Sequence, residues 1–244
     1  MGAEDAPTLV VVTGASSGIG RAVAEGAEAG GCRIATCSRR PLPGEHLAAD
    51  LSDPAAWTRV AAWVDGLITG TSWSRVVLVH AAATLTPIGF AGEVDAQAYT
   101  ANVLLNSAAP QVLGDAYLRS MAEVEATGVL LMVSSGAARS ARAGWTSYGA
   151  GKAAMDQWTR AAGMEQDQRG GRVRVLSVAP GTVDTDMQEQ IRSTPERDFP
   201  AAGQFAQLHA EGSLSNAGEV GRRLLALIDR HDLPNGLVLD LRDL

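Results

Sequence analysis

The sequence Leu9-Val10-Val11-Val12-Thr13-Gly14-Ala15-Ser16-Ser17-Gly18-Ile19-Gly20-Arg21 contains an apolar run followed by three glycines. The apolar run 9–12 predicts a strand that is buried on both faces, as in a parallel sheet. Gly14 permits a tight turn, Gly18 lets the backbone approach a ligand, and Gly20 lets a helix pack closely on the strand. Because N–H groups at a helix start attract anions, the segment predicts a site for the pyrophosphate of a dinucleotide.

The glycine spacing, G-x-x-x-G-x-G, differs from the G-x-G-x-x-G pattern of many dinucleotide sites. A purely structural turn also produces glycines of this kind, so the spacing alone is a weak signal. Its position directly after an apolar strand favours the nucleotide interpretation.

The composition bounds the class of protein. The 244 residues, 46% hydrophobic and 19% charged, suit one globular α/β domain. The net charge of -7 argues against a general nucleic-acid binder, because no basic excess offsets phosphate repulsion. No apolar run has the length of a membrane span, so we expect no membrane partner.

Two features favour the cytoplasm. Met1–Ala6 is acidic and has no apolar core, so we expect no signal peptide. Cys32 and Cys37 flank a predicted strand, and the extended chain between them holds them too far apart to form a disulfide. We therefore expect both cysteines to be reduced core residues.

Strand and helix signals alternate along the chain. Apolar runs predict strands over 9–12, 33–38, 75–79, 129–133, 173–178 and 237–241. Helical spacing predicts helices over 19–29, 96–121 and 218–230, and others that begin at Asp53-Pro54 and near Ser147. This order predicts one domain, residues 1–244, with a doubly wound (Rossmann) parallel sheet and helices on both faces. Residues 184–214 are polar and weakly periodic, which predicts a mobile lid over the substrate.

The end of the second predicted strand carries Ser38-Arg39-Arg40. An acidic residue there would accept hydrogen bonds from the adenosine ribose, and none is present. Arginine suits a 2′-phosphate instead, which favours NADP over NAD. Two solvated surface arginines are the alternative interpretation.

Tyr148 and Lys152 lie four residues apart in a predicted helix and therefore on one of its faces. An ordinary tyrosine, with a pKa near ~10, is a poor acid–base group at neutral pH. We expect the lysine cation to favour the phenolate and to lower that pKa. Ser135 follows a predicted strand, at the sheet edge where α/β proteins bind ligands. Taken alone, the tyrosine and lysine would be an ordinary surface pair.

Together these motifs resemble those of the short-chain dehydrogenase/reductase family over nearly the full chain. Thr13 to Gly20 resembles its T-G-x-x-x-G-x-G cofactor motif, while Ser135, Tyr148 and Lys152 resemble its catalytic positions. The resemblance implies cofactor contacts from a larger set, which is Gly14, Ser16, Ser17, Gly18, Ile19, Gly20, Ser38, Arg39, Arg40, Asp50, Leu51, Ala81, Ala82, Ala83, Tyr148, Lys152, Pro180, Gly181, Val183 and Thr185.

The family asparagine matches either of two positions, Asn102 or Asn106. We choose Asn106, because Asn106-Ser107-Ala108-Ala109-Pro110 resembles the N-L-x-A-P form of one branch. Its implied role is to position a water that resupplies protons. Asn102 has a simpler interpretation, a hydrogen bond on the helix surface or between helices.

One motif departs from the family. Its usual Asn-Asn-Ala-Gly is His80-Ala81-Ala82-Ala83 in this chain. The asparagine normally ties neighbouring strands, and we expect His80 to be a structural residue that replaces that hydrogen bond. The other histidines, His46, His209 and His231, show no metal-ligand spacing, so we expect no metal.

Gly144-Trp145 and the ending Gly236 to Asp243 resemble the benzil reductase and sepiapterin reductase branch. The resemblance implies an NADPH-dependent carbonyl reductase that acts on a neutral, bulky ketone such as benzil, with a substrate cleft formed by Leu85, Trp145 and Met187. Trp145 is equally interpretable as a packing residue of its loop. Arg139 and Arg142, in the loop after Ser135, leave an anionic substrate open. The alternatives are a pterin ketone reductase, a 3-oxoacyl-thioester reductase, or a sensor that binds NADP without catalysis. The resemblance also implies a homodimer that forms through the helices beginning at Ala96 and Ser147. A homotetramer is the alternative assembly.

Overall fold

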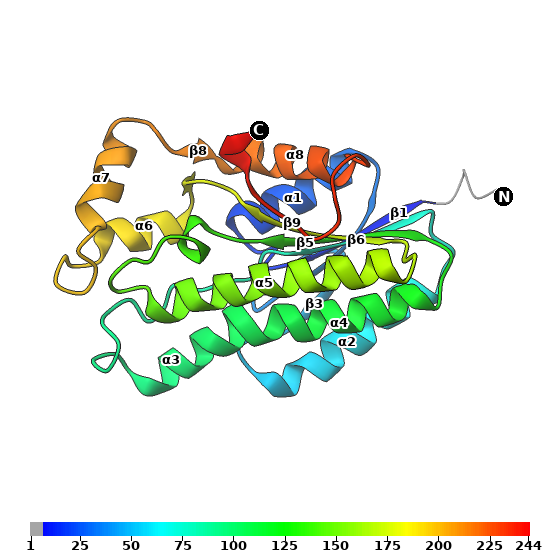
Figure 1. Ribbon diagram of the computed structural model, residues 1–244, viewed down its shortest axis with the longest axis horizontal. Helices are drawn as coiled ribbons and strands as arrows, with labels where there is room; N and C mark the ends of the chain where they lie inside the picture. The colour runs from blue at the N-terminus through cyan, green and yellow to red at the C-terminus, as the bar shows by residue number, and fades with distance from the viewer. Residues whose placement is uncertain (1–6) are drawn as a thin grey trace.

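A seven-stranded, fully parallel sheet forms the centre of the molecule (Figure 1). The computed structural model describes residues 7–244, so the expectation for Met1–Ala6 lies outside the described residues. Helices α1 and α8 cover one face of the sheet, and α2, α4 and α5 cover the other. The predicted fold class, a single doubly wound domain, is confirmed. Within residues 7–244, no helix combines the length and the apolar character that crossing a membrane requires.

The predicted elements are present with small shifts of their ends. The strands are β1 (Thr8–Thr13), β2 (Arg33–Ser38), β3 (Glu45–Ala48), β4 (Arg75–His80), β5 (Thr127–Val133), β6 (Val173–Ala179) and β9 (Leu237–Asp240). The main helices are α1 (Gly18–Ala29), α2 (Pro54–Thr69), α3 (Ala96–Val103), α4 (Ala109–Ala122), α5 (Thr146–Gln168) and α8 (Ala217–Ile228).

The strand order determines where ligands bind. It is β3-β2-β1-β4-β5-β6-β9, so the chain proceeds outward from β1 in one direction and from β4 in the other. In such a sheet the connections after β1 and β4 turn to opposite faces and leave a crevice at the carboxyl ends of these strands. The glycine motif after β1 and the segment after β4 both lie at this crevice.

Successive residues of β1 belong to different hydrophobic cores. Leu9 and Val11 pack in the core beneath α2, α4 and α5, whereas Val10 and Val12 pack in the core beneath α1 and α8. Side chains of a strand alternate between the two faces of its sheet, so a strand covered on both faces needs apolar residues at every position. This requirement explains the continuous run 9–12.

The helix predicted over 96–121 is not a regular α-helix. Between α3 and α4 the chain forms a π-helical turn, Leu104–Ala108, and continues without a break. A π turn accommodates an extra residue in the helix and often occurs at functional sites. Asn106 lies in the middle of this turn, a feature that the periodicity of the sequence does not reveal.

The segment predicted as a mobile lid, 184–214, contains two helices, α6 (Asp186–Ser193) and α7 (Ala202–Ala210). The short strands β7 (Val183–Asp184) and β8 (Ser215–Asn216) pair at its two ends. A third hydrophobic cluster includes Ile191 and Phe205 of this segment together with Trp145 and Tyr148. The helical periodicity is weak because each helix is short and buries few side chains.

His80 joins the two central strands. It lies at the end of β4, opposite Thr13 of β1, and its Nδ1 is 3.1 Å from the Thr13 hydroxyl. The same hydroxyl accepts a hydrogen bond from the N–H of Ala82 at 3.3 Å. This contact fits the structural role expected of His80. Burial, aided by the positive charge of Lys152, lowers the pKa of His80 to about 3.

The lowered pKa of His80 predicts acid sensitivity. In the unfolded chain this histidine has a pKa near ~6.5. Below that pH the unfolded state therefore binds a proton that the folded state does not bind. The contribution of His80 to the free energy of unfolding is therefore constant above that pH, and it decreases as the pH drops from ~6.5 towards about 3. In His80→Asn the group is absent, and urea unfolding between pH 6 and pH 5 should show a loss smaller by about 1 kcal/mol than in the wild type. Equal losses of unfolding free energy in the wild type and in His80→Asn would contradict the lowered pKa of His80.

Candidate active site

A cavity of about 470 Å³ opens at the carboxyl ends of the strands. The glycine turn, the end of β2, the segment after β4, the start of α5 and helix α6 all contribute to its lining. Two predicted site residues, Arg40 and Asn106, are not among the lining residues. Every other predicted catalytic, cofactor-binding or substrate residue lines this cavity.

Two glycines of the motif are required by packing. Gly14 has φ +70°, and a Cβ there would lie 2.6 Å from the backbone N of Ala82. A Cβ on Gly20 would lie 2.4 Å from the carbonyl oxygen of Gly14. Any larger residue would therefore push α1 away from the turn or the turn away from β4. The glycines bring the start of α1 to the edge of the cavity.

The start of α1 fits an anionic group. Its N-cap is Ser17, whose side chain makes no capping hydrogen bond, and its first turn has no acidic residue. By contrast, α2 and α8 are capped by the side chains of Asp53 and Asn216. Uncapped N–H groups at a helix start, beside a glycine turn that lines a cavity, suit the pyrophosphate of a dinucleotide.

The end of β2 separates the two predicted arginines. Arg39 lines the cavity with Ser38, Asp50 and Leu51. Arg40 instead donates a hydrogen bond to the carbonyl oxygen of Ser16 at 3.0 Å. The structure thus gives Arg40 a contact that holds the glycine turn, and of these two arginines only Arg39 lines the cavity.

Lys152 is fully buried beneath Tyr148 on α5. Its Nζ donates a hydrogen bond to the carbonyl oxygen of Val133 at 2.7 Å and lies 5.9 Å from the centre of the Tyr148 ring. Burial lowers the pKa of Lys152 to about 8, and the negative charge of Asp156 opposes this shift.

The pKa of Tyr148 is shifted in the direction opposite to our expectation. Burial raises it, and a hydrogen-bond interaction with the Ser135 hydroxyl only partly opposes the shift. The expectation of a lowered pKa is wrong for this arrangement, because the burial of the phenol dominates the shift. A raised pKa keeps the phenol protonated at neutral pH, as a proton donor must be.

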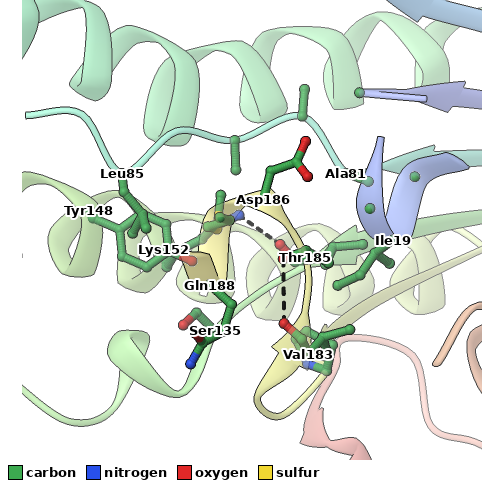
Figure 2. A pocket seen from close by; sticks show the side chains of 18 of the residues that line it. Ile19, Ala81, Leu85, Ser135, Tyr148, Lys152, Val183, Thr185, Asp186 and Gln188 are labelled. Carbon is green, nitrogen blue, oxygen red and sulfur yellow. Dashed lines mark hydrogen bonds between the residues drawn. The ribbon is translucent and has the colours of Figure 1, made fainter. Parts of the chain in front are cut away.

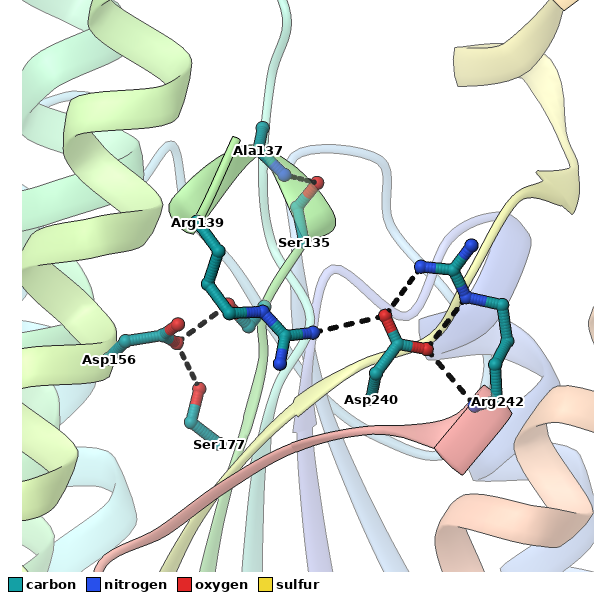
Figure 3. A network of polar contacts seen from close by, with 8 residues as sticks. Ser135, Ala137, Arg139, Asp156, Ser177, Asp240 and Arg242 are labelled. Atoms are coloured by element: carbon teal, nitrogen blue, oxygen red, sulfur yellow. Dashed lines mark hydrogen bonds and ion pairs between the residues drawn. The ribbon is translucent and has the colours of Figure 1, made fainter. Parts of the chain in front are cut away.

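Asp156 supports the buried ammonium of Lys152, and sequence analysis did not identify it. Its Oδ1 accepts hydrogen bonds from the hydroxyls of Ser134 and Ser177, each at 2.6 Å (Figure 3). These contacts tie α5 to β5 and β6 beneath the lysine. Its position four residues after Lys152, on the helix face that meets the sheet, is the signal that would have identified it.

Asn106 holds the backbone of Thr84. Its Oδ1 accepts a hydrogen bond from the Thr84 N–H at 3.1 Å, and its Nδ2 donates to the Thr84 carbonyl at 2.8 Å. Asn102 is also buried and donates to the Thr86 carbonyl at 2.9 Å. Both asparagines therefore fix the segment after β4. A Cβ on Gly151 would lie 2.8 Å from the Asn106 Cβ, so this turn packs directly against α5 beside Lys152.

Apolar side chains form part of the cavity wall. Leu85, Trp145 and Met187 line it, as predicted. The ring of Trp145 stacks on Phe199 at 4.6 Å between centroids and meets Tyr148 edge-on at 5.5 Å. Trp145 thus packs the segment 184–214 and also lies beside the phenol of Tyr148.

The C-terminal residues brace the cavity through a charge network. The Asp240 carboxylate is buried and accepts from Arg242 at 2.7 Å and from Arg139 at 3.1 Å (Figure 3). The Arg242 hydrogen bond lowers the pKa of Asp240. The pairing commits the charge of Arg139 to Asp240, and Arg242 lines the cavity next to Gly181. Sequence analysis did not find this network.

Within the part of the chain that the structure describes, no three His, Cys, Asp or Glu side chains come together in a way that could hold a metal ion.

Comparisons with known proteins agree with this geometry. The chain is 30% identical over 240 residues to a benzil reductase ((S)-benzoin forming) of Bacillus subtilis, covering 96% of this chain and 98% of the relative. It is 30% identical to the sepiapterin reductase of Mus musculus over 80% of this chain and 74% of the relative.

Solved structures show the same fold. The KRED1-Pglu enzyme superimposes with a TM-score of 0.78 at 26% identity, over 95% of this chain and 99% of that one. A short chain dehydrogenase/reductase of Saccharomyces cerevisiae gives 0.82 at 24% identity, over 97% and 96% of the two chains. The family model described as short chain dehydrogenase matches residues 8–196. The chain therefore belongs to the short-chain dehydrogenase family of oxidoreductases, which act on carbonyl and alcohol groups with a nicotinamide cofactor.

Proposed function

We propose that this protein is an NADPH-dependent carbonyl reductase whose substrate is a neutral, bulky ketone, in particular a 1,2-diketone such as benzil. The proposal rests on one observation. Tyr148, Ser135 and the buried Lys152 line a single cavity between an uncapped helix start and an apolar wall.

The residues divide the reaction between them. The reduced cofactor, held by the glycine turn and by Lys152, supplies the hydride. Tyr148 donates its phenolic proton to the carbonyl oxygen, and Ser135 donates a hydrogen bond to the same oxygen. Two donors directed at the oxygen where negative charge develops lower the barrier more than they stabilise the bound ketone. Asn106 acts as a positioning residue, which holds the segment after β4 and the turn beside Lys152.

The preference for NADPH follows from the end of β2. Arg39 lines the cavity there, and no acidic residue occupies the strand end. A guanidinium binds a phosphate through charge-assisted hydrogen bonds and can stack on an adenine. A carboxylate in that place would repel the 2′-phosphate and select NAD instead.

The substrate class follows from the wall of the cavity and from the relatives. Leu85, Trp145 and Met187 offer apolar contacts to a bulky ketone. Arg139 is not among the lining residues and pairs with Asp240, whereas Arg142 lines the cavity with its guanidinium over the ring of Phe205. The choice between a neutral ketone and an anionic acyl-carrier thioester therefore depends on Arg142, and the comparison of carbonyl compounds below tests it. The name of the Bacillus subtilis relative supports benzil, and that of the mouse relative supports a pterin ketone as the second candidate. Residues 184–214 would close over the substrate as a lid.

The proposal extends to assembly and compartment. Val103 and Val112 in the α3–α4 segment and Met164 on α5 are exposed apolar side chains on the helices expected to pair. Their exposure supports a homodimer, and two such dimers could form a homotetramer. Cys32 and Cys37 are free thiols, which suits a cytoplasmic enzyme.

Replacing Arg39 with alanine tests the choice of cofactor. Arg39→Ala should weaken NADPH binding by ~2 kcal/mol, or roughly 30-fold in Kd, and leave NADH nearly unchanged. Titration of intrinsic fluorescence with each cofactor measures both constants. Arg33→Ala, at the opposite and exposed end of β2, is the matched control. Equal losses for the two cofactors would refute the assignment.

Comparing three carbonyl compounds tests the substrate class. We expect kcat/KM for benzil to exceed that for an acetoacetyl thioester and for a simple aliphatic ketone, because the cavity wall is apolar beside Tyr148. Steady-state loss of NADPH absorbance gives the three values. A kcat/KM for the thioester more than about tenfold above that for benzil, or ~1.4 kcal/mol in transition-state binding, would contradict the diketone assignment.

A further inference from the structure

Gln188 on α6 is buried and lines the cavity, and neither sequence analysis nor the proposed mechanism gives it a role. Its Oε1 accepts a hydrogen bond from Nη1 of Arg192 at 2.9 Å. The same Arg192 nitrogen lies 3.5 Å from the Asp184 carboxylate, which keeps the guanidinium in place.

The hydrogen bond from Arg192 fixes which way the amide faces. A guanidinium has donors only, so the amide must turn its oxygen towards Arg192 and its NH2 group away from it. That NH2 group, Nε2 of Gln188, is buried and has no hydrogen-bond partner among the described residues. A buried donor without a partner is costly, so its retention in a cavity wall indicates a ligand that satisfies it.

The NH2 group of Gln188 lies at the end of the cavity where the proposed reaction takes place. Figure 2 shows Gln188 on the same side of the cavity as Ser135 and Tyr148, and away from Ile19 and Ala81. It therefore belongs to the substrate end of the cavity. Nε1 of Trp145, in the same wall, is a second buried N–H without a partner among residues 7–244.

We propose that Gln188 is a specificity-determining residue, whose NH2 group donates a hydrogen bond to a second oxygen on the carbon next to the reacting carbonyl. This inference rests on the proposed function and narrows it to vicinal dicarbonyl compounds. A neutral amide donor, already polarised by Arg192, matches a neutral carbonyl oxygen.

The contact with Gln188 leaves the stoichiometry of the reduction unchanged. Hydride from NADPH adds to one carbonyl carbon, the proton of Tyr148 adds to its oxygen, and NADP⁺ leaves. The second carbonyl, held by Gln188, is unchanged, so the product is an α-hydroxy ketone. Gln188 thus selects substrates that carry two adjacent oxygens and fixes which carbonyl faces Tyr148.

Two variants and two ketones test the role of Gln188. Gln188→Glu keeps an acceptor for Arg192 but has no donor for the substrate, and Gln188→Met removes both. Benzil and deoxybenzoin share their carbon frame, and deoxybenzoin lacks the second oxygen. Gln190→Met is the matched control, because this neighbouring glutamine is exposed, donates to Thr86 and does not line the cavity.

We expect each Gln188 variant to lower kcat/KM for benzil by ~10-fold or more and that for deoxybenzoin by less than ~3-fold, with the Kd for NADPH unchanged. Losses by the same factor for both ketones, in whichever variant folds, would overturn this inference and leave the proposed function standing. A wild-type enzyme that binds NADPH but reduces neither ketone would overturn the proposed function itself, and this inference with it.

Discussion

The buried ammonium of Lys152 is the interaction on which the site depends. A cation removed from water is stable only with a partner that compensates its lost hydration. Here the carbonyl oxygen of Val133 accepts its hydrogen bond, and Asp156 supplies a negative charge from one helical turn below. Of the two serines that donate to Asp156, one directly follows β5 and the other lies in the neighbouring strand β6, so the charge is anchored at the sheet. Moving α5 would break all these contacts together.

The chemistry of the phenol follows from this packing. With α5 fixed by Lys152, Tyr148 lines the cavity beside Ser135 and the ring of Trp145. The same burial that excludes water raises the pKa of Tyr148, which favours the protonated phenol that the proposed reaction requires. The apolar wall and the proton donor are therefore consequences of one packing arrangement.

The parts of the fold that sequence could predict are those with a local and repeated signal. Residues 9–12 announce a strand covered on both faces, and Gly14 and Gly20 are needed wherever a helix packs this closely on a turn. The pairing of Tyr148 with Lys152 follows from helical spacing alone. Local signals therefore suffice to predict the glycine turn and the placement of Tyr148 and Lys152 on one helix face.

What sequence could not predict depends on contacts between distant segments. The Asp240 network joins the C-terminal residues to the loop after β5, and no local pattern encodes it. The π turn at Asn106 is invisible to periodicity, since one extra residue barely disturbs the apolar spacing. The raised pKa of Tyr148 is a property of its burial, which spacing from Lys152 does not reveal.

The most direct measurement of the central claim is single-turnover oxidation of bound NADPH by benzil, in the wild type and in Tyr148→Phe. We expect rapid loss of NADPH absorbance and formation of benzoin in the wild type. In the variant, which keeps the ring but not the proton, we expect a rate lower by at least ~10³-fold with an unchanged Kd for NADPH. Equal rates in the two proteins, or NADPH bound without any turnover in the wild type, would contradict it.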